Sequence, residues 1–170
     1  MQKLDCIIIG AGFSGLYQLH CLRDKLKLNT LVIEEGKDIG GTWYWNTYPG
    51  ARCDSESFTY GFTFSEKIFK NWTWKERYPK QNVILKYLKY FSNELKLNKN
   101  IVFNEKVISA KYIEKNNLWK VQTNNKKNYY TKYLICAVGS LSSINLPKIK
   151  GINPFKGQLH HSGRWPRTKI

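Results

Sequence analysis

The stretch LDCIIIGAGFSGLYQLHCLRDKLKL, residues 4–28, decides the fold. It opens with a continuous apolar run from Cys6 to Ile9, which is typical of a buried parallel strand. It closes with leucines at intervals of three or four residues, which predict one apolar face of a helix: Leu16, Leu19, Leu22 and Leu26. Three glycines lie between the two patterns, so the sequence predicts a strand, a tight turn and a helix.

The turn Gly10-Ala11-Gly12-Phe13-Ser14-Gly15 has the spacing GxGxxG. Gly10 permits the tight turn, Gly12 lets a diphosphate approach the backbone, and Gly15 lets the helix pack closely on the strand. The helix start adds unpaired N–H groups and a partial positive charge that favour phosphates. We therefore expect a dinucleotide at this turn; a glycine turn without a ligand is the alternative.

Glu34 closes the next apolar run, TLVIEEG at residues 30–36, about 20 residues beyond the glycines. Its carboxylate can accept hydrogen bonds from both hydroxyls of a ribose, and its charge would repel a 2′-phosphate. This favours FAD or NAD over NADP as the first nucleotide. Glu35 is the alternative residue for binding the ribose, but it is expected to face solvent.

The rest of the chain supplies a long loop, a helix and three strands. Residues 40–57, GGTWYWNTYPGARCDSES, have no period, and ordered loops of this length are usually functional. Residues 81–97 are predicted to be helical, with one apolar stripe: Ile84, Tyr87, Leu88, Phe91 and Leu95. The strands NIVFNEKVISAKYIEK, LWKVQTN and NYYTKYLICAVG follow, with hairpin turns at Asn116-Asn117 and at residues 124–127.

These elements predict an α/β fold, namely an incomplete Rossmann-like FAD-binding domain. Its parallel sheet would start with a βαβ unit, carry a three-stranded antiparallel β-meander and include the apolar run 133–138 as a buried parallel strand. Residues 1–150 would form this domain and residues 151–170 a linker. FAD is favoured over NAD because the GGTWYWN stretch and the meander fit a two-part FAD-binding region better than a continuous βαβ series.

Charge and cysteine content argue against several classes of protein. The net charge is +16, but the lysines are scattered, so we expect no nucleic-acid surface. No apolar run reaches the roughly 20 residues of a membrane span. The chain has four cysteines and no CxxC pair, which favours a reducing cytoplasm: Cys6, Cys21, Cys53 and Cys136. Cys6 and Cys136 lie in apolar runs and are expected in the core. No metal site is expected, because the three histidines have no carboxylate or thiolate neighbours in the sequence: His20, His160 and His161.

The segment Phe155-x-Gly157-x-x-x-His161-x-x-x-Trp165-Pro166 resembles the FxGxxxHxxxW(P/D) fingerprint of Baeyer–Villiger monooxygenases. The 40–57 loop is similar to a second hallmark of that family, and GAGFSGLY and YLICAVG stand in the family's order. The resemblance covers the whole chain. It implies an enzyme that uses FAD, NADPH and O₂ to insert oxygen into a ketone through a C4a-peroxyflavin, forming an ester or lactone.

Two other functions stay open beside this one. A related flavin-containing monooxygenase would oxidise nitrogen or sulfur atoms, and a stand-alone nucleotide-binding module would have no reaction of its own. A flavin-dependent disulfide reductase ranks last because its CxxxxC redox pair is absent.

The resemblance also implies which positions contact the cofactors. The ADP half of FAD would be held by the glycine turn and the acid: Gly10, Gly12, Phe13, Ser14, Gly15 and Glu34. The flavin side would be lined by Thr42, Trp43 and Trp45, with Tyr60 nearby. The backbone of Val107 would meet the adenine. The segment Arg52, Cys53 and Asp54 would reach both flavin and nicotinamide.

Two residues would have catalytic or conformational roles by the same resemblance. Asp54 would orient an active-site arginine that lies outside this chain, where negative charge develops; a loop-capping carboxylate is the alternative. His161 would couple the motions of the nucleotide domains, and a buried structural histidine is its alternative. Trp165 is expected to be a packing anchor.

The sequence departs from the family pattern at two points. Thr47 stands where the family usually has an arginine. The chain also ends at Ile170, before the second glycine-rich fold that would bind NADPH. We therefore expect an N-terminal fragment that is inactive by itself and whose partner is the missing C-terminal part of the same enzyme.

Overall fold

The computed structural model describes residues 4–168. One six-stranded sheet has the order β3-β2-β1-β6-β5-β4. The strands are β1 (Leu4–Ile9), β2 (Thr30–Ile33), β3 (Ile101–Val102), β4 (Val107–Ile113), β5 (Leu118–Thr123) and β6 (Asn128–Cys136). The helices are α1 (Phe13–His20), α2 (Thr42–Trp45), α3 (Glu66–Lys70) and α4 (Gln81–Glu94).

The sheet changes from parallel to antiparallel within β6. Strand β1 pairs in parallel with β2 and β6, and β2 pairs in parallel with β3. Strands β4, β5 and β6 form the antiparallel meander. Thr131 of β6 is opposite Leu4 of β1 and Trp119 of β5, so it belongs to both parts. The predicted α/β fold with a parallel sheet and a meander is confirmed.

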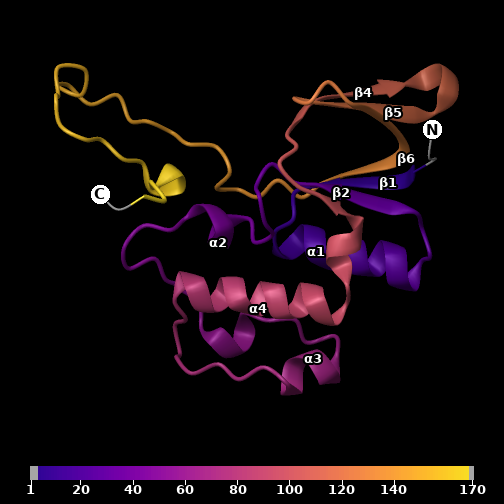
Figure 1. Ribbon diagram of the computed structural model, residues 1–170, viewed down its shortest axis with the longest axis horizontal. Coiled ribbons are helices and arrows are strands. Elements are labelled where there is room, and N and C mark those ends of the chain that lie inside the picture. The colour runs from indigo at the N-terminus through magenta and orange to yellow at the C-terminus, as the bar shows by residue number, and fades with distance from the viewer. Residues whose placement is uncertain (1–3, 169–170) are drawn as a thin grey trace.

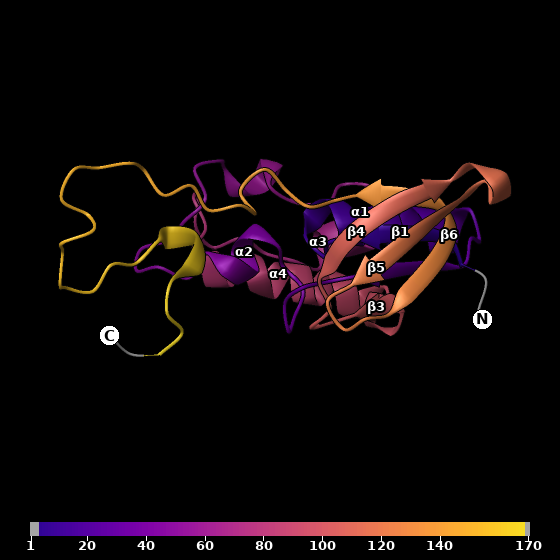
Figure 2. The ribbon, with the colours of Figure 1, turned by 90° about the horizontal axis from the view of Figure 1, so that it is seen from above.

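Two apolar cores lie on opposite faces of the sheet. Helices α1 and α4 lie on one face, and their core includes Leu16, Leu88 and Phe91 (Figure 1). The meander curls over the other face and encloses a smaller core that includes Ile7 and Val121 (Figure 2). The parallel strands are apolar on both sides because each side is covered in this way.

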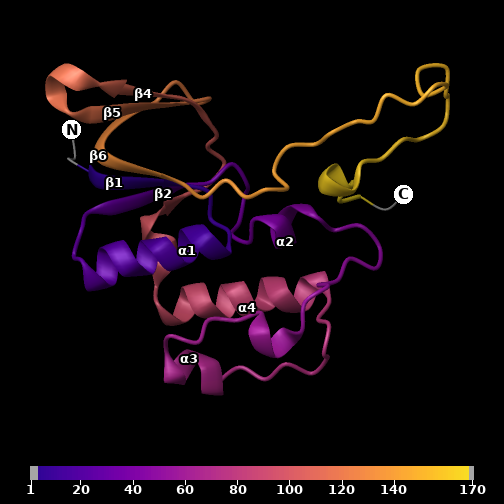
Figure 3. The same cartoon turned by 180° about the vertical axis from the view of Figure 1, so that it is seen from behind.

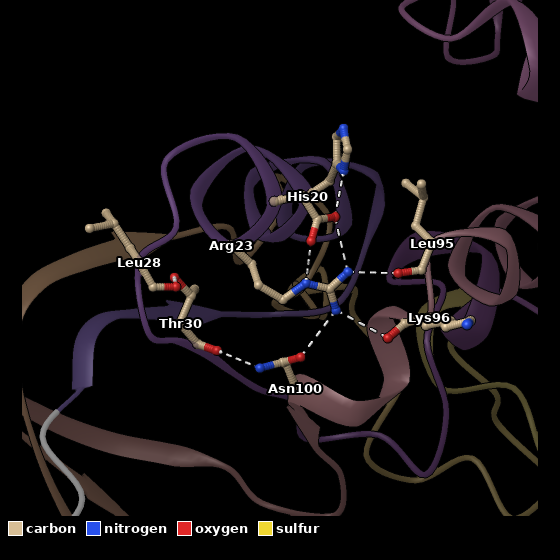
Figure 4. Close-up of polar contacts among 8 residues, drawn as sticks. His20, Arg23, Leu28, Thr30, Leu95, Lys96 and Asn100 are labelled. Atoms are coloured by element: carbon tan, nitrogen blue, oxygen red, sulfur yellow. Dashed lines mark hydrogen bonds and ion pairs between the residues drawn. The ribbon is translucent and has the colours of Figure 1, made fainter.

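A polar network joins the end of the α1 helical segment to the end of α4 (Figure 4). The Arg23 guanidinium donates to the carbonyl oxygens of Leu95 (2.6 Å), the C-cap of α4, and of Lys96 (3.1 Å), the next residue. It also binds the Asp24 carboxylate at 2.7 Å and the Asn100 side chain at 3.1 Å. Asn100 in turn donates to the Thr30 carbonyl of β2 (3.2 Å), so the network fixes both helical segments against the sheet.

The prediction that residues 100–115 form one strand is wrong. The chain pairs with β2 through β3, turns at residues 103–106, and then pairs with β5 through β4. Asn104 has a left-handed φ of +57°, and its N–H donates to the Gly36 carbonyl (2.9 Å). The adjacent Glu105 N–H donates to the Glu34 carbonyl (2.9 Å), so backbone bonds to the end of β2 hold the turn.

Two predictions of burial are also wrong. Leu26 is 63% exposed because the turn at Cys21–Lys25 is π-helical and shifts the helical phase. Cys136 is exposed because β5 pairs with β6 only as far as Thr131, so the second half of β6 lies beyond the meander. For the same reason Tyr133 and Val138 in the predicted buried strand are exposed. Cys6 and Cys53 are buried.

Beyond β6, residues 137–168 contain no long helix or strand. The chain leaves the sheet at Gly139 (φ +75°), extends away from the body and returns to lie beside α2 (Figure 3). The one regular element within residues 137–168 is the short 3₁₀ turn Ser162–Arg164, which lies in the predicted linker. None of the helices in residues 4–168 is long and apolar enough to cross a membrane.

Candidate dinucleotide site

The glycine turn after β1 depends on missing side chains. Gly10 has a left-handed φ of +101°, and a Cβ there would lie 2.6 Å from the Ala137 carbonyl oxygen. A Cβ on Gly15 would overlap the carbonyl oxygen of Gly10. The turn therefore packs against the end of β6 and lets α1 begin directly above β1, as the sequence predicts.

The N-terminus of α1 is left open for an anion. Its N-cap is Gly12, which has no side chain to accept a hydrogen bond from the first turn. The first N–H groups of a helix have no intrahelical acceptor, and the helix dipole adds positive potential there. Ser14 is exposed in this first turn, whereas Phe13 turns inward and its ring lies 5.1 Å from that of Tyr60. Phe13 thus offers its N–H to a ligand and its ring to the core.

Glu34 lies at the end of β2 beside this helix start and is 5% exposed. Its carboxylate accepts from the Ala11 N–H (2.7 Å) and from the Gly36 N–H (2.6 Å). Burial raises the pKa of Glu34, and these two bonds only partly offset that rise. Each carboxylate oxygen retains a second lone pair for a ribose hydroxyl. Glu35 is exposed and pairs with Lys106 (3.1 Å), as expected.

A second glycine pair faces the glycine turn. The Gly40 N–H donates to the Ala11 carbonyl (3.0 Å), and Gly41 has a φ of +53°. The close approach of Gly12 and Gly41 leaves backbone rather than side chains around the α1 N-terminus. A pyrophosphate fits such a site because it needs close N–H groups and no steric bulk. The residues present therefore fit the ADP half of a dinucleotide.

Helix α2 begins directly after this pair and carries Thr42, Trp43 and Trp45. Trp43 is buried, and its Nε1–H donates to the Tyr60 hydroxyl (3.1 Å) with the rings at 90°. Burial raises the pKa of Tyr60, and the hydrogen bond from Trp43 offsets only part of that rise. Trp45 is half-buried. The structure thus brings Trp43 and Tyr60 together and places Thr42 next to Gly41.

Residues 51–53, which lead to Asp54, pair with residues 79–81. The Cys53 N–H donates to the Pro79 carbonyl (2.9 Å), and Cys53 itself is buried. Arg52 points outward, 2.6 Å from the Glu76 carboxylate. Asp54 is exposed, and among residues 4–168 no salt bridge uses its carboxylate. An exposed carboxylate can receive a cation from outside the chain.

Thr47 and Val107 are both partly buried, but one buries a polar atom and the other an apolar side chain. The Thr47 hydroxyl oxygen is buried and has no hydrogen-bond partner within residues 4–168. Val107 begins β4 opposite Thr123, and its side chain packs against the smaller core under the meander. Its predicted backbone contact to an adenine stays a prediction.

The fingerprint segment folds on itself. The Phe155 ring lies over Gly157, where any Cβ would overlap it. His161 Nδ1 accepts from the Gly163 N–H (3.0 Å) and caps the 3₁₀ turn. The Trp165 ring contacts the His160 ring in a tilted arrangement, with ring centroids 5.5 Å apart and an interplanar angle of 56°. His161 is thus half-buried and structural in this arrangement, and its predicted coupling role stays a prediction.

Sequence reasoning missed three residues that hold α2. Gln81 donates from its side chain to the Trp43 carbonyl, and Arg167 donates to the Tyr44 carbonyl (2.7 Å). The Arg164 guanidinium lies over the Trp45 ring at 4.8 Å. The available signal for Gln81 was its polar side chain at the first position of the predicted helix 81–97.

Comparison with known proteins agrees with this geometry. The family described as Flavin-binding monooxygenase-like matches residues 3–169. A Baeyer–Villiger monooxygenase from Pseudooceanicola batsensis is 43% identical over 95% of this chain and 30% of its own length. A phenazine N-monooxygenase from Lysobacter antibioticus is 41% identical over the same shares. The crystal structure of NADP⁺-bound cyclohexanone monooxygenase from Rhodococcus sp. Phi1 matches with a TM-score of 0.93 and 40% identity, over 99% of this chain and 32% of that one. The chain therefore spans about 30% of the length of the curated relatives it matches.

Proposed function

This chain belongs to the Flavin-binding monooxygenase-like family, and from that premise we propose that it forms the FAD-binding part of a Baeyer–Villiger monooxygenase. The enzyme would use NADPH and O₂ to insert one oxygen atom into a ketone, giving an ester or lactone. The observation that carries the proposal is the docking of the fingerprint segment on α2, directly beside the two glycine motifs.

The ADP half of FAD would lie on the α1 N-terminus. The N–H groups of the first turn and the Gly12–Gly41 contact would receive the pyrophosphate, and Glu34 would accept from the ribose hydroxyls. Because Glu34 is buried, its interaction with the ribose would be little screened by water. FAD would supply the redox chemistry of the reaction once bound.

The flavin side would be formed by α2 and by residues 51–54. Thr42, Trp43 and Trp45 would line the flavin and exclude water from it. Asp54, whose carboxylate is exposed, would hold an arginine of the complete enzyme where negative charge develops. Residues 1–150 would serve as the FAD-binding part and residues 151–170 as the linker to an NADPH-binding part. The free cysteines would suit a reducing compartment such as the cytoplasm.

Titration with FAD tests the first step of this proposal. The 170-residue chain should bind FAD, seen as quenching of flavin fluorescence, and Glu34→Gln should weaken binding while Glu35→Gln should not. A folded chain, judged by circular dichroism, that does not bind FAD would overturn the proposal. The reaction itself is tested by supplying NADPH, O₂ and a cyclic ketone to the enzyme and assaying for the lactone.

Oxidation of nitrogen is the second candidate reaction. It is favoured by the phenazine N-monooxygenase, which matches almost as well as the Baeyer–Villiger relative. The same assay separates the two reactions, because a nitrogen heterocycle in place of the ketone would give an N-oxide. Formation of the N-oxide without any lactone would favour the second candidate.

A further inference from the structure

The carbonyl groups of Thr42, Trp43 and Tyr44 in α2 are each bound by a side chain from a different part of the chain. The Thr42 carbonyl accepts from the Asn46 side chain (2.9 Å), which lies in the following loop. The Trp43 carbonyl accepts from Gln81, the first residue of α4. The Tyr44 carbonyl accepts from Arg167 of the tail (2.7 Å).

A helix of four residues needs such partners. The Thr42 carbonyl also accepts the Asn46 backbone N–H (2.9 Å), but the Trp43 and Tyr44 carbonyls depend on donors from elsewhere, and one turn has too few internal bonds to offset its entropy. The orientation of α2 is therefore set by the groups that bind it. Two of these groups, Gln81 and Arg167, come from segments far away in the sequence.

Gln81 joins the two segments that flank the proposed flavin position. Its side chain binds the Trp43 carbonyl, while its backbone N–H donates to the Ala51 carbonyl (2.9 Å). Ala51 begins the segment that carries Asp54. One residue thus fixes the spacing between α2 and residues 51–54.

Arg167 holds α2 from the tail. Besides its bond to the Tyr44 carbonyl, its guanidinium lies 4.1 Å from the centre of the Tyr44 ring, and Arg164 lies over the next ring, Trp45. A cation is favourable at the C-terminal end of a helix. The fingerprint segment is therefore attached to the same short helix that Gln81 binds.

We propose that Gln81 and Arg167 are positioning residues that set α2 against the flavin ring of FAD. The inference rests on the proposed FAD site. Neither side chain touches the α1 N-terminus or Glu34 in the described contacts, so both should act on the flavin half of the cofactor and leave the ADP half alone.

Paired titrations with ADP and FAD test this distinction. Gln81→Met keeps the length of the side chain but removes the donor, and Arg167→Met does the same for the tail. Each should weaken FAD binding about tenfold and reduce the quenching of flavin fluorescence, while ADP binding stays unchanged. Arg167→Lys, which retains a donor, should recover part of the loss. Gln122→Met on β5 is the matched control, since Gln122 bonds to Ser109 far from α2.

The outcomes separate positioning from simple stability. Equal losses of ADP and FAD binding, or unchanged FAD binding and fluorescence in both methionine variants, would overturn the inference. Hydrogen exchange in the chain without FAD is a second measurement. It is followed at the Trp45 amide of α2 and at the Asn46 amide that comes directly after the helix. Exchange should be about tenfold faster in Gln81→Met than in Gln122→Met, and equal rates would contradict the role of Gln81. Because exchange needs no cofactor, it judges the inference even if the wild-type chain fails to bind FAD.

Discussion

Gly12 and Gly41 approach each other so closely that a Cβ on Gly41 would lie 2.9 Å from the Gly12 Cα. The contact joins two glycine motifs that are separated in the sequence by a helix and a strand. It keeps the α1 N-terminus lined by backbone, where the pyrophosphate is proposed to bind. We therefore predict that a larger side chain at position 41 would weaken cofactor binding more than it would destabilise the fold.

Gly41→Ala should raise the dissociation constant for FAD about tenfold or more, because the new methyl group must push the two motifs apart. Gly50→Ala is the matched control: Gly50 also has a left-handed φ (+79°), but a Cβ there meets nothing within 4 Å. Both variants should lose stability from backbone strain, measured by urea unfolding. If FAD binding falls equally in both, strain and not the Gly12–Gly41 contact controls the site.

The raised pKa of Glu34 predicts a pH dependence for FAD binding. The ionised carboxylate accepts from the ribose, and burial makes protonation begin above the ordinary value of 4.5. FAD binding should therefore weaken as the pH is lowered from 7 towards 4.5, at a higher pH than that at which exposed carboxylates titrate. Glu34→Gln should bind FAD about tenfold more weakly at pH 7 and lose this pH dependence. A wild-type affinity that stays constant over this range would refute the role of Glu34.

The pKa of Glu105 is shifted in the opposite direction from that of Glu34. Burial alone would raise its pKa, but hydrogen bonds from Lys127 (2.8 Å), Tyr129 (2.8 Å) and Thr123 (2.9 Å) outweigh it and lower the pKa below 4.5. A lowered pKa stabilises the fold above the unfolded value, and this stability is lost as the pH falls through the folded value. Glu105→Gln should cost about 2 kcal/mol of unfolding free energy at pH 7.

The loss should shrink as the pH falls below 4.5, because the carboxyl of the unfolded chain is then protonated while the folded carboxylate still resists protonation, and the stabilisation disappears once the pH passes the lowered pKa of the folded state. Urea unfolding at pH 7 and pH 3.5 measures both values. Glu114→Gln, at an exposed position in the same meander, serves as the control. A loss that is the same at both pH values would mean that charge on Glu105 contributes nothing to stability.

The sequence predicts the parts of this site that depend on local pattern. The apolar run, the glycine spacing and Glu34 all fall within one strand–turn–helix–strand unit, and the structure places them together. Residues that act across long separations leave no period to detect. Gln81 and Arg167 bind α2 from 36 or more residues away, and the break between β3 and β4 depends on backbone bonds to Glu34 and Gly36. The exposure of Cys136 likewise depends on where β5 ends, which the apolar pattern of β6 does not encode.

Thr47 stands where the resembling family usually has an arginine, and its hydroxyl is buried without a partner within residues 4–168. A buried, unpaired hydroxyl costs free energy, and removing it by an isosteric change recovers that cost. Thr47→Val keeps the shape and should raise the unfolding free energy by about 1 kcal/mol, with no change in FAD binding. Thr59→Val is the control, since the exposed Thr59 hydroxyl donates to the Glu56 carbonyl (2.8 Å) and its loss should not stabilise the chain. If Thr47→Val is instead destabilising, the hydroxyl has a partner in solution, such as a bound water, and the departure from arginine is compensated at this position.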